Sequence, residues 1–182
     1  MTETVGFQRE KMRELILFIA HAQKNDESFG RVKLAKLLYY ADNEAFLRLG
    51  KPITRATYQK LKDGPAAREF LPLKEEMITR GEAEEKALQW PNGFTSLRLV
   101  ALRDPKTEMF GEGELALVKR VLDRYKNVGG TAISKLSHEE VGWKVAQMNT
   151  TIPYSAYLLA PKMSKQHRTF AIKKAKSLSL VS

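Results

Sequence analysis

The stretch from Lys33 to Pro65 constrains the fold more than any other, because it joins a long apolar helix pattern to strong turn signals. Apolar side chains recur at helical spacing through its first half, and Tyr39-Tyr40 widens that stripe until two faces need cover. The stripe consists of Leu34, Leu37, Leu38, Ala41, Ala45 and Leu49. Gly50 and Pro52 then end the pattern. We therefore predict a central helix that is buried on much of its circumference.

The second half of this stretch alternates apolar and polar residues from Ile53 to Leu61, which favours a short, partly exposed strand. Asp63-Gly64-Pro65 follows as a turn, in which Gly64 precedes a proline and is kept out of the helical region. Pro65 suits the first position of the next helix, where no amide hydrogen is needed. Outward-facing aromatic and cationic side chains on such a strand suit protein recognition, although a plain solvated strand explains them equally well. The candidate partner-binding residues here are Tyr58, Lys60, Lys62, Gly64 and Pro65.

The rest of the chain predicts more helices and a pair of strands. Helical patterns cover residues 7–23, 68–80 and 114–125. Residues 82–104 change to a strand pattern around a turn, and we expect them to form one small antiparallel sheet with residues 53–61. The predicted fold class is α+β and predominantly α-helical, with helices around a central buried helix and a small antiparallel β-sheet.

The segment after residue 130 carries a signal for the start of a helix. Residues 131–136 are a short apolar segment, and Ser137 and Glu140 then have the spacing of a capping box. We expect the following helix to run through Trp143 to Met148, with residues 152–159 packing back on the core. The capping role also accounts for Ser137 beside His138, because a nucleophile and its base must face each other across a fold.

Composition and charge divide the chain into a body and a tail. With 182 residues, 43% of them apolar, the chain suits a single domain, which we assign to residues 1–161. The formal net charge is +10, but residues 141–182 hold seven cations and no carboxylate, so residues 1–140 carry only +3. We interpret residues 162–182 as a basic C-terminal tail, either solvated or ordered on an acidic partner. Its candidate partner-binding residues are Arg168, Phe170, Lys173 and Lys174.

Several function classes find no support in the sequence. The absence of cysteine excludes disulfides and cysteine-based zinc sites, and three scattered histidines lack the spacing of a metal site. No phosphate-binding loop is present, so we expect neither an enzyme nor a cofactor. The longest apolar run, Leu15 to Ala20, is far shorter than the ~20 residues of a membrane span. Without a secretory signal, we expect a soluble cytoplasmic protein with no membrane partner.

Four motifs in this order resemble the SocA-like antitoxin family, also called the Panacea domain. They are KLAKLLYYAD (33–42), GKPIT (50–54), ATYQKLKDGP (56–65) and LSHEEVGW (136–143), and the resemblance covers residues 32–159. It implies a mainly helical domain that acts as the antitoxin of a prokaryotic or phage toxin–antitoxin system. Such an antitoxin binds and neutralises a toxin protein encoded beside it. Similar domains are paired with unrelated toxin classes, so the resemblance does not identify the toxin.

Two other functions stay open at the level of the sequence. A sequence pI of about 9.7 and the basic end favour a nucleic-acid-binding regulator, although no helix-turn-helix signature is present. An adaptor that delivers a toxin to a protease is also compatible with the family. A homo-oligomer stays open as well.

Overall fold

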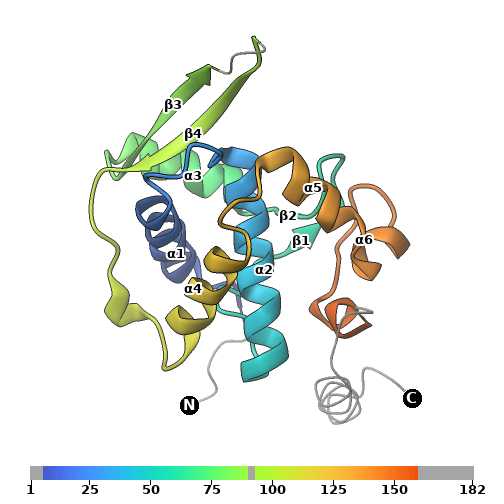
Figure 1. Ribbon diagram of the computed structural model, residues 1–182. Coiled ribbons are helices and arrows are strands. Elements are labelled where there is room, and N and C mark those ends of the chain that lie inside the picture. The colour runs from blue at the N-terminus through green and yellow to red at the C-terminus, as the bar shows by residue number, and fades with distance from the viewer. Residues whose placement is uncertain (1–5, 90–92, 160–182) are drawn as a thin grey trace.

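Helix α2 (Arg31–Leu49) is the axis around which the other helices pack (Figure 1). The computed structural model describes residues 6–89 and 93–159. Most residues of α2 are buried, including both tyrosines of the doublet Tyr39-Tyr40. Gly50 ends the helix in the left-handed conformation, with φ of 75°, and its amide hydrogen bonds to the carbonyl of Phe46. The predicted central buried helix is confirmed.

The remaining helices lie on different sides of α2. They include α1, α3 and α4, which correspond to the three helical patterns predicted at residues 7–23, 68–80 and 114–125. α1, α4 and α5 contact α2 directly, whereas α3 packs on α1 and α6 packs on α5. A 3₁₀ turn, η2, returns the chain to α2. The bounds are α1 Arg9–Ala22, α3 Phe70–Thr79, η1 Thr107–Met109, α4 Glu114–Arg124, α5 Gly130–His138, α6 Val141–Val145 and η2 Tyr154–Leu159.

The strands form two separate two-stranded antiparallel sheets instead of the single sheet that we predicted. β3 (Ala83–Gln89) and β4 (Thr95–Ala101) make a hairpin whose outer end projects from the top of the molecule (Figure 1). β1 (Tyr58–Gln59) pairs with β2 (Ala66–Ala67) beside α2. The prediction of a hairpin within residues 82–104 is confirmed, and its pairing with residues 53–61 is wrong.

The segment from Ile53 to Pro65 differs from its prediction in two ways. The strand is confined to β1, and Ile53, Ala56 and Tyr58 are all buried, so the expected exposure of Tyr58 is wrong. Pro65 does not begin a helix, because the next two residues pair with β1 and α3 starts only at Phe70. A proline does lie in the first turn of α3, at Pro72, where its missing amide hydrogen is not needed.

The predicted capping box is also wrong. Ser137 lies inside α5, and its hydroxyl donates to the carbonyl oxygen of Ser134 at 2.6 Å. Glu140 is the residue that precedes α6, and no side chain caps that helix. α6 ends at Val145, before the expected Met148.

The C-terminal part of the described chain completes the core. Ile152 and Tyr157 are buried, which confirms that residues 152–159 pack back on the body. Within residues 6–89 and 93–159, no helix combines the length and apolar character that crossing a membrane requires. The tail, residues 162–182, with its four candidate residues, lies outside the described residues.

Candidate protein-binding surface

Asp42 joins three of the sequence motifs inside the protein. Its side chain is 0% exposed, and it accepts hydrogen bonds from the backbone amide of Thr54 at 2.7 Å, from the Thr54 hydroxyl, and from the Tyr58 hydroxyl at 2.8 Å. Burial raises the pKa of the Asp42 carboxyl, and the bonds from Thr54 and Tyr58 partly oppose that rise. Tyr58 is therefore an internal anchor for the segment after α2 and offers no surface to a partner.

Lys36, six positions earlier on α2, holds the Gly-Pro corner. Its side chain is 2% exposed, and its ammonium group donates to the carbonyl oxygen of Pro65 at 2.9 Å. Burial lowers the pKa of Lys36 to about 8, and nearby Asp63 partly opposes that change. Gly64 has φ of +95°, and a Cβ atom there would lie 2.7 Å from Lys36 Cε and even closer to Ser137 Oγ. The close packing explains why a glycine occupies this position.

Helix α5 closes the corner from the other side. Ser134 Oγ donates to the carbonyl oxygen of Asp63 at 2.7 Å, and Ser137 is fully buried against Gly64. Gly64 and Pro65 are both buried as a result. The structure thus brings together motif residues that are far apart in the sequence, and it uses Gly64 and Pro65 to hold the chain that carries Leu61 and Lys62.

Trp143 lies where this held chain meets α6. Its Nε1 donates to the carbonyl oxygen of Leu61 at 3.1 Å, and its ring stacks on His138 with 4.0 Å between the ring centroids. The Lys60 ammonium group lies 4.3 Å from the centroid of the Trp143 ring and also donates to the carbonyl oxygen of Ala146 at 2.9 Å. Three separate contacts therefore fix the orientation of a half-buried tryptophan.

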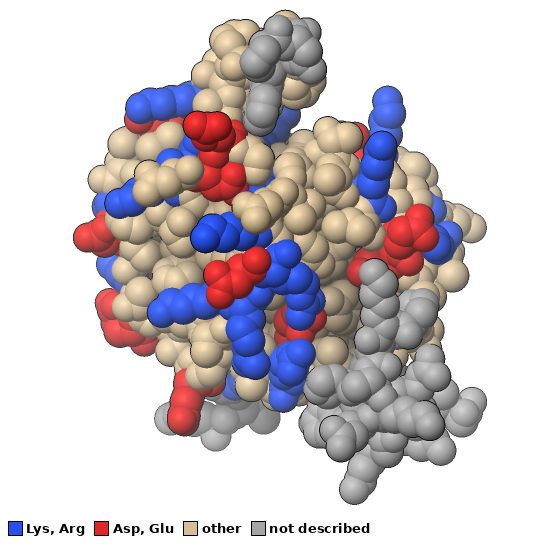
Figure 2. Space-filling model, viewed as in Figure 1, with Lys and Arg blue, Asp and Glu red and all other residues tan. Residues whose placement is uncertain are grey.

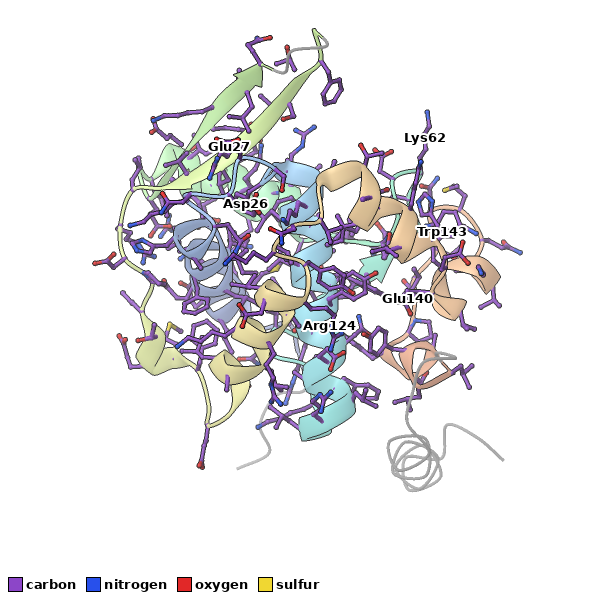
Figure 3. The ribbon with its side chains drawn as sticks, in the orientation of Figure 1. Asp26, Glu27, Lys62, Arg124, Glu140 and Trp143 are labelled. Carbon is purple, nitrogen blue, oxygen red and sulfur yellow. The ribbon has the colours of Figure 1, made fainter. Side chains whose placement is uncertain are left out.

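Exposed side chains also occur on the two segments that meet at this tryptophan. Lys62 is exposed and extends from the body next to Trp143 (Figure 3). Further along the chain, Val145 is 73% exposed and Met148 is 52% exposed. Hydrogen bonds from Lys60 N to Thr150 O (3.0 Å) and from Asn149 N to Lys60 O (2.8 Å) tie their loop to the end of β1. We call this set the Trp143 surface: Lys60, Lys62, His138, Trp143, Val145 and Met148.

The sequence identified only part of this surface. Lys60 and Lys62 are among the predicted candidates; the structure leaves Lys62 exposed and half-buries Lys60 against Trp143. The sequence does not predict that Trp143 stacks on His138, because that contact depends on the turn between α5 and α6. The available signal was the motif LSHEEVGW, which is followed by Lys144 and then by the apolar Val145.

The described residues give no sign of a metal centre. In residues 6–89 and 93–159, no group of three or more histidine, aspartate or glutamate side chains is placed to hold a metal ion. Charges of both signs are interspersed on the face seen in Figure 2, where Lys and Arg side chains lie among Asp and Glu. The Trp143 surface combines an aromatic ring held in place with exposed apolar side chains nearby in the chain, and aromatic and apolar residues are common in protein interfaces.

Comparison with known protein families agrees with the resemblance that the four motifs indicate. The sequence model of the family described as "Antitoxin SocA-like, Panacea domain" matches residues 34–144, a span that runs from the first turn of α2 almost to the end of α6. Searches of curated proteins and of solved structures gave no match. The family match covers more than half of the chain. This chain belongs to the SocA-like antitoxin family and carries its Panacea domain.

Proposed function

We propose that this protein is the antitoxin of a two-gene system and that it neutralises its toxin by direct binding through the Trp143 surface. Membership of the SocA-like family supports the class of function. The observation that carries the proposed site is the fixed geometry of Trp143, a half-buried residue held by Leu61, His138 and Lys60. Occlusion of a toxin in the cytoplasm needs no cofactor and no catalytic group.

The physical argument rests on the cost of ordering side chains at an interface. Each flexible side chain that is immobilised on binding costs ~0.5 to 1.5 kcal/mol, and a tryptophan already fixed in place avoids that cost. Tryptophan is also enriched among the residues that contribute most to binding energy. Lys62 makes no ion pair within the described part of the chain, so its charge is available to a carboxylate of the toxin.

The other predicted residues take supporting roles in this proposal. Gly64 and Pro65 hold the corner that positions Leu61 and Lys62. In the tail, the proposed roles are steering by Arg168, Lys173 and Lys174, and an apolar contact by Phe170. A chain ending at Pro161 is then expected to bind the toxin more slowly without losing its fold.

The test is expression of the small gene beside this one, alone and together with this chain. The toxin alone should arrest growth, and co-expression of the wild-type antitoxin should restore it. Val145→Arg should abolish the rescue, whereas Leu71→Arg, at a 52% exposed position on α3, should preserve it. No rescue by the wild type with either neighbouring gene would refute the function. Equal rescue by both variants would refute only the assigned surface.

A further inference from the structure

A second feature, away from the Trp143 surface, is a polar pocket in the lower part of the molecule. Its volume is about 560 Å³, and it lies where the start of α1, the segment after α2 and the start of α4 come together (Figure 1). This size is within the ~300 to 1,000 Å³ typical of pockets for small molecules. The side chains that matter here belong to Phe7, Lys11, Lys51, Pro52, Arg55 and Glu114.

The charges that line this pocket do not cancel. Lys11 Nζ lies 2.7 Å from Glu114 Oε2, so the single carboxylate of the lining already has a cationic partner. Lys51 and Arg55 form no ion pair with any residue in 6–89 or 93–159. The pocket therefore holds two positive charges without counter-charge, and these charges favour an anionic ligand.

The backbone at Arg55, which lines the pocket, has an unusual conformation. Its φ of 56° is in the left-handed region, which costs about 1 to 3 kcal/mol for a residue other than glycine. The buried residues on both sides enforce this conformation: Thr54 is bound to Asp42, and the amide of Ala56 donates to Thr54 Oγ1 at 3.2 Å. The hydrogen bonds of Asp42, which anchor β1, therefore also hold the backbone next to Arg55.

Two further features limit the kind of anion. The first turns of α1 and α4 contribute Lys11 and Glu114 to the lining, so the positive ends of two helix dipoles add to the field. Phe7 and Pro52 supply apolar surface beside the cations.

We propose that this pocket binds a phosphate-bearing small molecule of nucleotide type, with its phosphates at Lys51 and Arg55 and its flat ring against Phe7 and Pro52. The proposal does not depend on the toxin-binding function.

The experiment uses the full chain and calorimetric titration with two probes, inorganic pyrophosphate and ADP, at low and at physiological salt. Both probes carry a diphosphate unit, and only ADP carries a ring. We expect both to bind, with ADP the tighter of the two. Arg55→Asn, which tolerates a left-handed backbone, combined with Lys51→Gln should weaken both about tenfold or more. Lys119→Gln with Arg120→Gln removes two cations from α4 elsewhere and should leave both affinities unchanged.

Each other outcome overturns the proposal. Absence of binding by either probe at low salt would show that the pocket is not an anion site. Equal weakening of binding by the α4 control variant would show that the probes are attracted only by the overall positive charge of the protein. Tighter binding of pyrophosphate than of ADP would contradict the nucleotide type. If the Arg55 and Lys51 variant lost affinity for the toxin while wild-type protein bound neither probe, the pocket would belong to an acidic protein contact instead.

Discussion

Lys36 and Asp42 are two of the buried charged residues of helix α2 and have opposite sign, and a comparison of the two shows how one helix fixes two loops by different means. Asp42 is surrounded by three donors from Thr54 and Tyr58, so its oxygens are satisfied without any cation. Lys36 has three donor hydrogens but, within the described residues, one acceptor, the carbonyl of Pro65. The loop at Asp42 is thus held by hydrogen bonds.

The loop at Lys36 depends far more on packing. Gly64 fits between Lys36 and Ser137 with no room for a Cβ atom. Burial lowers the pKa of Lys36 to about 8, so its ammonium group is only moderately favoured in the folded state at neutral pH. The comparison shows that close packing around Gly64 holds one loop, whereas hydrogen bonds to Asp42 hold the other. The predictions below separate the two.

The largest effect is expected at Gly64. Gly64→Val would force a β-branched side chain into the left-handed region and into contact with Lys36 and Ser137, so we expect a loss of ~4 kcal/mol or more in the free energy of unfolding. The control is Gly81→Val, which has a similar positive φ of 68° but nothing within 4 Å of its Cβ position. Denaturant unfolding of both variants measures the difference. Equal losses would show that strain, and not packing, matters at the corner.

The next effect concerns the hydrogen bonds of Asp42. Asp42→Ala leaves the buried hydroxyls of Thr54 and Tyr58 and one amide without their acceptor, which should cost ~3 kcal/mol. Asp42→Asn keeps an oxygen for the Thr54 amide and resembles the protonated carboxyl that the raised pKa favours. We expect it to cost less than ~1.5 kcal/mol. Chemical denaturation compares the two, and a larger loss for the asparagine variant would contradict a role based on hydrogen bonds.

The smallest effect is the pH dependence that Lys36 adds. The pKa of Lys36 is about 8 in the folded protein and 10.5 ordinarily, so the unfolded chain binds more protons between these values. The free energy of unfolding should therefore rise with pH, by at most ~1.4 kcal/mol per unit. Measurements from about pH 7.5 to 9.5 avoid the titration of unfolded tyrosines, which has the opposite sign. Lys36→Met should remove the rise, and an unchanged slope in that variant would assign it to another group.

The sequence predicted those parts of the fold whose signal is local. The apolar stripe of α2 and the helical pattern of α4 identify both helices, and the change to a strand pattern around a turn in residues 82–104 identifies the β3–β4 hairpin. The burial of Tyr58 was missed because its partner, Asp42, lies sixteen residues away on another element. The predicted capping role of Ser137 is wrong for the same reason. The spacing of a capping box is a local signal, whereas the burial of Ser137 depends on Gly64, far away in the sequence.

The candidate surface likewise combines residues that could be predicted from the sequence with residues that could not. Lys60 and Lys62 could be chosen as exposed cations, whereas the fixed position of Trp143 arises only when α6 meets the carbonyl of Leu61. No pattern within residues 136–143 encodes that contact.

Amide hydrogen exchange of the free protein and of its complex with the neighbouring gene product tests the central claim most directly. The account predicts new protection at residues 60–62 and 141–148, because the toxin covers the Trp143 surface. It predicts little change around Asp42, whose amide partners are already buried, and none in the β3–β4 hairpin. Protection confined to that hairpin, or absent from residues 141–148, would contradict the assignment of the binding surface.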